Sequence, residues 1–222
     1  MKKALLVALL MAVATVAWGA TPGEIRAGAV EEGTRVELSG VVVTSVLHSS
    51  FTVTALPAGP DQALWVMTDP DPMVAVGDVL DLRGVYIEYK DITTIWAHGW
   101  TVVDQIDPPT MYATASQLMG EPERYESCVL QVTDGLIVVE ILPEGDWIVV
   151  SFEDGTTLVR LNAYWFDPSI VFAGQCYNNA TGLFTFHDGE FLLKVFPGGL
   201  ALTDCTVGTD DISFGSIKAL YR

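Results

Sequence analysis

Residues 76–86 have the sequence VGDVLDLRGVY, and residues 173–184 have the sequence AGQCYNNATGLF. Each stretch opens with an apolar residue and a glycine, Val76-Gly77 or Ala173-Gly174. A second glycine, Gly84 or Gly182, follows seven residues later in the first stretch and eight in the second. A glycine inside a strand marks a sharp bend or a close approach of two backbones. The two stretches therefore predict the same long, bent strand, present twice in the chain.

The similarity extends outward from these strands in both directions. Each half opens with a Thr-x-x-Glu/Gln box, at Thr21 or Thr114, which is a pattern that caps the start of a helix. The offset between the halves is 93 residues at these threonines and 97 at the first glycine of the bent strand, and such a steady offset indicates duplication. Runs that alternate apolar and polar residues predict the remaining strands. These are 35–46, 50–53, 63–66 and 92–97 in the first half, and 127–141, 146–149, 157–160 and 190–196 in the second.

Five strands per half, with glycines inside the long first and fourth strands, favour a small closed barrel. Gly40 and Gly135 lie inside the first strand of each half, where a strand that serves both sides of a barrel must bend. The five-stranded OB-fold uses this device. A single β-sandwich is the alternative, but its strands would not repeat in two blocks of five. We predict an all-β chain with two tandem five-stranded OB-like barrels after an N-terminal signal peptide.

A family resemblance supports this fold. Residues 36–44 (VELSGVVVT), 50–53 (FTV preceded by Ser50) and 76–85 resemble bacterial OB-fold domains of secreted proteins, which often accompany extracellular nucleases. The resemblance implies an OB-fold over nearly all of the chain after the signal peptide, while the nuclease catalytic domain is absent from this sequence. The second half is similar at residues 125–126, 129–132 and 182–183.

The N-terminus has the pattern of an export signal. Lys2 and Lys3 precede the uncharged apolar stretch 4–18, and an Ala-Trp-Gly motif then predicts cleavage after Gly19 or Ala20. The apolar stretch is shorter than the roughly 20 residues that span a membrane, and no later stretch is long and apolar enough to do so. We expect an exported protein that is periplasmic, extracellular or on the cell surface. The expected segments are signal peptide 1–20, barrels 21–107 and 109–206, and tail 207–222.

The tail allows two interpretations. Residues 214–222 (FGSIKALYR) resemble short C-terminal segments of exported proteins from some uncultivated bacterial lineages, which share an aromatic-Gly-x-Ile-Lys pattern. That resemblance implies a sorting or attachment signal. The alternative is an added strand or a frayed terminus.

Charge and aromatic residues bear on the partner. The chain has 28 acidic and 11 basic side chains, for a formal net charge of −17, and such a surface repels phosphate backbones. OB-folds bind ligands on one strand face, where aromatic rings stack on bases or other groups. The candidate ligand-binding residues are Trp65, Tyr86, Tyr89, Trp96 and Trp147. We predict a noncatalytic secreted binding or surface-interaction module with a protein or glycan partner. The alternatives are an accessory single-stranded nucleic-acid-binding protein and a hydrolase with a scattered site.

No motif for catalysis or metal binding occurs in the sequence. His48, His98 and His187 have no His-Glu-x-x-His spacing, and the chain has no Gly-x-Ser-x-Gly elbow, phosphate-binding glycine loop or twelve-residue Ca²⁺ loop. A hydrolase needs a nucleophile, a base and an orienting group together. We therefore predict a protein that is not an enzyme and has no catalytic residues, metal or cofactor.

Three cysteines leave one thiol over if a single disulfide forms. Strands four and five of the second barrel are expected to form a hairpin that turns near Asp188. This hairpin brings Cys176 at its start close to Cys205, which follows its end. We predict a Cys176–Cys205 disulfide, with Cys128 buried as a small apolar residue.

Overall fold

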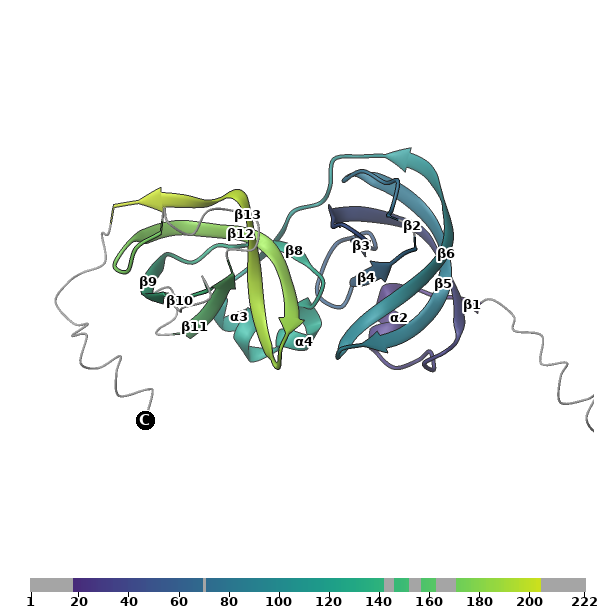
Figure 1. Cartoon of the computed structure of the whole chain (residues 1–222), viewed down its shortest axis with the longest axis horizontal. Coiled ribbons are helices and arrows are strands. Elements are labelled where there is room, and N and C mark those ends of the chain that lie inside the picture. Colours follow the sequence, from purple (N-terminus) through teal and green to yellow (C-terminus); the bar gives the residue numbers. More distant parts are fainter. Residues whose placement is uncertain (1–17, 70, 142–145, 152–156, 163–170, 205–222) are drawn as a thin grey trace, which may run out of the picture.

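The computed structural model describes residues 18–69, 71–141, 146–151, 157–162 and 171–204, and the protein in these ranges is mostly β. Its strands form two sheets that lie side by side, with the chain passing once from the first to the second (Figure 1). Three short helices accompany the sheets within these ranges. Within the described ranges, no helix has the length and apolar character needed to span a bilayer.

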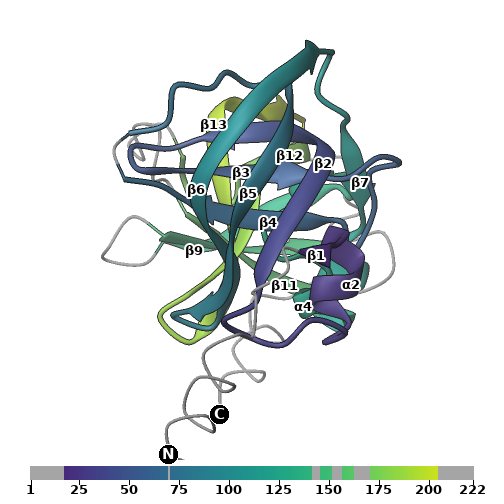
Figure 2. The same ribbon diagram turned by 90° about the vertical axis from the view of Figure 1, so that its right-hand side faces the viewer.

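The first sheet closes into a ring of five strands, which faces the viewer in Figure 2. Around the ring the order is β2-β3-β4-β6-β5, and β5 pairs again with β2. All pairs in the ring are antiparallel except β4 with β6, which are parallel. This order and the parallel pair are those of an OB-like barrel, here called the first barrel. Its strands are β2 (Arg35–Val46), β3 (Ser50–Thr54), β4 (Ala63–Met67), β5 (Asp78–Tyr89) and β6 (Ile92–Gln105), and β1 (Trp18–Gly19) runs parallel to β2 outside the ring.

The second sheet repeats this order and is here called the second barrel. Its ring is β9-β10-β11-β13-β12, closed by pairing of β12 with β9, and β11 and β13 are its parallel pair. β8 pairs with β12 beside the ring, and β7 runs parallel to β8. The strands are β7 (Met111–Ala113), β8 (Val129–Val132), β9 (Leu136–Ile141), β10 (Asp146–Ser151), β11 (Thr157–Asn162), β12 (Cys176–His187) and β13 (Glu190–Thr203).

Both predicted capping boxes are confirmed. The Thr21 side chain accepts the Glu24 amide at the start of α2 (Pro22–Arg26), and Glu24 accepts the Thr21 amide in return. Thr114 and Gln117 make the same pair of bonds at the start of α3 (Ala115–Gly120), which the four-residue α4 (Pro122–Tyr125) follows. These bonds satisfy amides that have no partner inside so short a helix.

Each barrel has its own apolar core. In strands such as β5 and β9, buried residues alternate with more exposed ones, which is the period-two pattern that identified strands in the sequence. Phe51, Leu64 and Leu80 are fully buried in the first core, and Leu130 and Phe184 are fully buried in the second.

The predicted first strand of the second barrel is interrupted. The sequence indicates one strand over 127–141, but the structure has β8 and β9 with a break at 133–135. Asp134 lies in this break, is buried, and accepts a hydrogen bond from the Ala115 amide at the start of α3. The Asp134 carboxylate thus accepts from a helix amide, and strand pairing stops between β8 and β9 at this residue. In the first barrel the strand stays continuous through a bulge at Gly40, whose φ of 67° suits glycine.

The fifth strands are longer than predicted. The sequence ends them at 97 and 196, whereas β6 continues to Gln105 and β13 to Thr203. Their pairing with β5 and β12 continues past the polar and glycine-rich residues that interrupt the alternation, with bulges taking up the irregularity. His98 therefore lies inside β6 rather than after it.

Candidate binding cleft between the two barrels

One outer face of the first barrel is covered. Phe51 and Val53 on β3 point into the first core, so Ser50, Thr52 and Thr54 point outward, yet these three are buried too. The Thr52 hydroxyl lies 2.8 Å from those of both Thr44 and Ser45 on β2. The second barrel covers this face, because residues of the two barrels line shared cavities along it. In an OB-fold the corresponding second and third strands form the ligand face.

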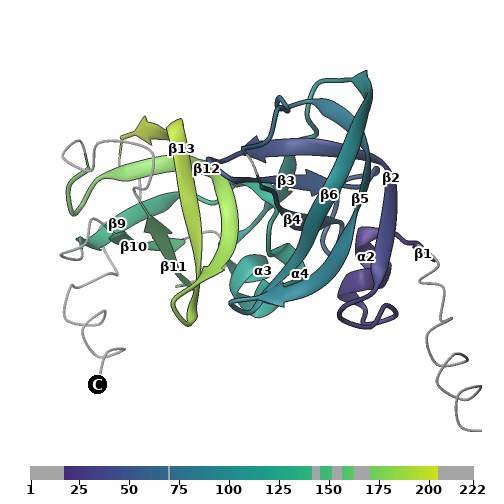
Figure 3. The same ribbon diagram turned by 45° about the vertical axis from the view of Figure 1, so that its right-hand side comes forward.

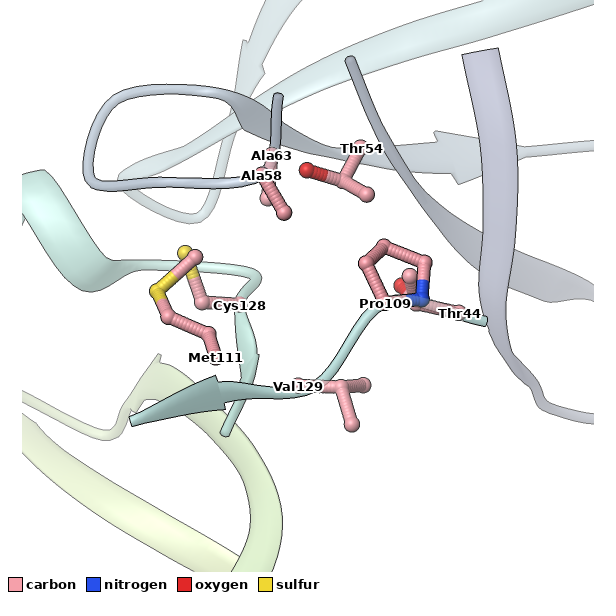
Figure 4. A pocket seen from close by; sticks show the side chains of 8 residues that line it. All are labelled: Thr44, Thr54, Ala58, Ala63, Pro109, Met111, Cys128 and Val129. Carbon is pink, nitrogen blue, oxygen red and sulfur yellow. The ribbon is translucent and has the colours of Figure 1, made fainter. Parts of the chain in front are cut away.

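A small cavity in Figure 4 shows how closely the barrels meet there. Its volume of about 10 Å³ is at the lower limit for one water molecule and too small for a ligand. It is lined by Thr44, Thr54, Ala58 and Ala63 from the first barrel and by Pro109, Met111, Cys128 and Val129 from the second part of the chain. Ala63 also packs within the second core.

A buried arginine joins the barrels at a point here called the junction, formed by Arg26, Ala63, Glu123 and Glu126. Arg26 ends α2, and its side chain is only 6% exposed. Its guanidinium donates to the carbonyls of Ala63 (2.8 Å), Glu123 (3.0 Å) and Glu126 (2.8 Å), and to the Glu126 carboxylate (2.8 Å). These bonds link α2 and β4 of the first barrel with α4 and the residue that follows it.

Glu126 is held in an unfavourable environment for a charge. Its side chain is 1% exposed, and burial raises the pKa of its carboxyl, while the charge and hydrogen bond of Arg26 oppose that rise. The Thr93 amide donates to Oε2 at 3.3 Å, whereas Oε1 has no hydrogen-bond partner among the described residues. The carboxylate therefore depends mainly on Arg26 for compensation of its charge.

A second connection lies beside the junction. Arg124 donates to the Asp61 carboxylate at 2.8 Å, and the Asp61 amide donates to the Arg124 carbonyl at 2.6 Å. The two barrels are thus connected by backbone and side-chain bonds from several elements, which positions their facing surfaces.

Aromatic side chains from both barrels line a cleft of about 190 Å³ between the β5–β6 and β12–β13 hairpins, whose tips lie side by side in Figure 3. We call it the interbarrel cleft. Its lining residues are Ser49, Ser50, Trp65, Met67, Tyr89, Lys90, Ile92, Thr94, Thr185, Phe186, His187 and Lys194.

Three rings contribute to the interbarrel cleft from both barrels. Trp65 on β4 is partly buried, and Tyr89 at the end of β5 is 41% exposed. Phe186 on β12 is held edge-on against Phe191, with ring centroids 5.0 Å apart. The Lys90 ammonium lies 5.7 Å from the centre of the Tyr89 ring, which is within the range of a cation–π contact.

The structure separates the predicted ligand-binding residues. Trp65 and Tyr89 line the cleft. Trp96, 38% exposed, shares the outer face of the sheet with Met67, its neighbour across the β4–β6 pair. Tyr86 belongs to the first core, and its hydroxyl donates to Glu88. Trp147 lies on β10, and its side chain is outside the part of the structure that is described.

Phe186, Lys90 and Lys194 also line the cleft, and sequence reasoning did not select them. The duplication contains a signal that could have found two of them. Lys90 and Phe186 lie at or next to the tips of equivalent hairpins, between the fourth and fifth strands of their barrels. A comparison of equivalent turns in the two halves would have selected both residues, although it would not have predicted that they line the same cleft.

The histidines are exposed. His48 lies 3.5 Å from Asp71 and His187 lies 3.5 Å from Asp188, in pairs whose side chains are more than half exposed. His98 is also exposed. Within the described ranges, no group of three or more His, Cys, Asp or Glu side chains is placed to hold a metal ion.

The cysteines behave differently from one another. Cys128 is a free thiol, 1% exposed, and burial raises its pKa to about 12. The Cys128 carbonyl accepts the Phe184 amide, eight residues along β12 from Cys176, which corresponds to roughly 25 Å of strand. A disulfide needs Cα atoms within about 7 Å, so Cys128 cannot reach Cys176. Cys176 pairs with Thr203 across the hairpin. Cys205 lies outside the described residues, so the Cys176–Cys205 bond remains a prediction.

Alkylation with iodoacetamide tests this prediction. The native protein should react at none of its cysteines, because the Cys128 thiol is buried and protonated near neutral pH. In urea without reductant one cysteine should react, and after reduction all three. Mass mapping should then find Cys128 as the residue that reacts first. Reaction of more than one cysteine in urea without reductant, or a bridged peptide that contains Cys128, would contradict the assignment.

No protein-family model matches this chain, and no curated protein matches it. Among solved structures, it is similar in part to one described as the structure of the hypothetical protein ygiW from E. coli. The similarity covers 35% of this chain and 83% of that one, with 17% sequence identity and a TM-score of 0.28. A likeness of this extent indicates neither a fold nor an activity for this chain.

Proposed function

We propose that this protein is a noncatalytic, exported binding module whose ligand occupies the interbarrel cleft. The observation that supports this most directly is the convergence of Trp65, Tyr89 and Phe186 from both barrels on one hollow. Its volume of about 190 Å³ suits a group the size of one ring, since an apolar cavity of about 150 Å³ can hold benzene. The ligand is either a small molecule or one end group of a larger partner.

The walls of the interbarrel cleft are held in position without a ligand, and this favours binding in the cleft. The junction and the Arg124–Asp61 pair hold the barrels together without the ligand. A preformed site loses less conformational entropy when it binds. The aromatic rings are therefore placed before the ligand arrives.

Export is part of the proposal. Cleavage after Gly19 or Ala20 would remove β1, which pairs with β2 at only two positions. The five strands of the first ring and the capping box at Thr21 lie beyond the cleavage site. The mature chain would keep the whole barrel.

Single-stranded nucleic acid is a weaker candidate. It needs a positive groove along which bases stack on aromatic rings. Here the outer face of β3 is buried under the second barrel, and the net charge is −17. A long strand would have to bind elsewhere on an acidic surface.

Residue-resolved NMR of the mature protein tests the proposed function. Benzyl alcohol serves as a neutral ring probe, and a labelled single-stranded oligonucleotide at low salt serves as the competing ligand. We expect benzyl alcohol to shift the signals of Trp65 and Tyr89, and Trp65→Ala to weaken its binding about ten-fold. Trp96→Ala is the matched control, because Trp96 is exposed on the same sheet face but does not line the cleft.

Two results would overturn the proposal. One is the absence of benzyl alcohol shifts at the cleft, or shifts that persist unchanged in Trp65→Ala. The other is saturable, salt-sensitive binding of the oligonucleotide, which would favour the nucleic-acid-binding function instead.

A further inference from the structure

Each barrel has a short strand directly before its capped helix. In the first barrel this strand is β1, which runs parallel to β2 and lies beside it in Figure 3. In the second barrel it is β7, which runs parallel to β8. Both strands begin three residues before the threonine that caps the next helix, Thr21 or Thr114. The duplicated unit of this chain therefore starts with this strand.

The two short strands also have the same register. Trp18 of β1 pairs with the β2 residue that pairs on its other side with Gly84 of β5. Met111 of β7 pairs with the β8 residue that pairs on its other side with Gly182 of β12. Gly84 and Gly182 are the equivalent glycines of the two fourth strands. β1 is thus the structural counterpart of β7, which is an internal part of the chain.

The residue after β1 belongs to the first core. Ala20 is 8% exposed, and its counterpart Ala113 is 2% exposed in the second core. The Ala20 amide also donates to the Glu37 carbonyl on β2 at 3.1 Å. Cleavage after Gly19 or Ala20 would keep the ring of five strands, but it would remove a strand that the second barrel retains. Cleavage after Ala20 would remove a core residue as well.

A sequence that suits cleavage occurs upstream of β1. Residues 12–14 are Ala-Val-Ala, which has the small-x-small pattern of a signal-peptide cleavage site. Cleavage after Ala14 would leave residues 4–11 as an uncharged apolar stretch of eight residues, within the roughly 7 to 15 residues of a signal-peptide core. Lys2 and Lys3 would still precede that stretch. The upstream site therefore satisfies the same criteria as the downstream one and spares β1.

We propose that the signal peptide is removed after Ala14, so that the exported protein begins at Thr15 and keeps β1 as part of the first barrel. The inference rests on the export that is part of the proposed function. The reaction is hydrolysis of one peptide bond by a signal peptidase of the host. Water adds its hydroxyl to the Ala14 carbonyl carbon and its hydrogen to the Thr15 nitrogen as the bond between them breaks.

The first residue of the exported protein tests the inference. The full chain is produced in a bacterial host with an intact export pathway, and the extracytoplasmic protein is examined by intact mass and N-terminal sequencing. We expect Thr15 as the first residue. A chain that begins at Ala20 or Thr21 would overturn the inference and leave the proposed binding module in place. A chain that keeps Met1 would overturn both the inference and removal of a signal peptide.

Two tyrosine substitutions locate the bond. Ala14→Tyr places a bulky side chain directly before the proposed bond and should slow processing about ten-fold in a pulse-chase experiment. Gly19→Tyr is the matched control, because nothing lies within 4 Å of a Cβ built at Gly19 and the second barrel has Tyr112 at the equivalent place. It should be processed like the wild type. Slow processing of Gly19→Tyr with normal processing of Ala14→Tyr would overturn the inference.

Retention of β1 should also be visible in stability. A chain that begins at Thr15 should unfold about 4 °C higher than one that begins at Thr21, because the shorter chain lacks the β1–β2 pairing and the buried Ala20. Equal unfolding midpoints would overturn the structural role of β1. Both chains should bind benzyl alcohol equally, since β1 does not line the interbarrel cleft. Loss of this binding in both chains would count against the proposed function and not against the cleavage site.

Discussion

Replacing Arg26 with methionine should lower the free energy of unfolding by about 3 to 5 kcal/mol, as expected when one partner of a buried ion pair is removed. The Glu126 carboxylate, 1% exposed, would lose its counter-charge, and three carbonyls at the junction would lose a donor. Urea unfolding followed by tryptophan fluorescence measures the loss. Arg83→Met is the control, because the Arg83–Glu37 pair is exposed and should contribute less than about 1 kcal/mol.

The double variant Arg26→Met/Glu126→Leu separates the charge from the packing. It removes the orphaned carboxylate, so it should recover most of the stability that the single variant loses. Full loss in the double variant would show that the carbonyl contacts of Arg26, rather than its charge, hold the junction. A loss below about 1 kcal/mol in Arg26→Met alone would contradict the importance of the junction.

The Arg26→Met variant should also respond to pH. Without Arg26, burial raises the Glu126 pKa with less opposition, so the folded state holds a proton that the unfolded chain releases above its ordinary pKa of about 4.3. The variant's deficit relative to the wild type should therefore grow as the pH rises above that value. Unfolding curves at pH 5 and pH 8 test the sign, and a larger deficit at pH 5 would contradict it.

Replacing Gly182 with valine should destabilise the protein by about 3 kcal/mol, near the upper end of the usual range for overpacking a core. A Cβ atom at Gly182 would overlap the carbonyl of Lys194 and the Cα of Val195 on β13. These are backbone atoms of the paired strand, which cannot turn away as a side chain could. Thermal and urea unfolding of Gly182→Val provide the measurement.

Gly99→Val is the matched control for this substitution. Gly99 lies on β6, and nothing lies within 4 Å of a Cβ built there, so the change should stay within about 0.5 kcal/mol. Equal stability of the two variants would show that β12 and β13 can separate at Gly182 without penalty. Gly84 occupies the equivalent place in the first barrel, where a Cβ would overlap Ile95 and the Trp96 carbonyl.

The role of Gly84 and Gly182, the glycines inside the two fourth strands, could be predicted from the sequence. The spacing identified Gly84 and Gly182 as equivalent and predicted either a bend or a close approach of backbones. Both occur, because each lies at a bulge where the fourth strand meets the fifth. The break at Asp134 was missed, since its cause is a hydrogen bond to Ala115 on a helix that precedes it by nineteen residues.

The candidate site was predicted only in part. Aromatic character alone selected Trp65 and Tyr89, which line the cleft, but it selected Tyr86 equally, and Tyr86 lies in the core. Alternation along β5 would have helped, because Tyr86 and Tyr89 are three residues apart and so point to opposite faces. Lys90 and Lys194 also line the cleft, but no aromatic character or periodic pattern in the sequence singles them out.

The sequence by itself determined the local structure of this protein: the repeated strands, the two capping boxes and the hairpins, because alternation, capping and turn chemistry act between residues close in the chain. The tertiary structure alone decided which outer face is covered and which side chains meet. Arg26 binds Glu126 at a separation of 100 residues, and Lys90 and Lys194 line one cleft from two different hairpins. Such contacts depend on how two barrels pack, and packing between surfaces far apart in the chain leaves no periodic pattern in the sequence.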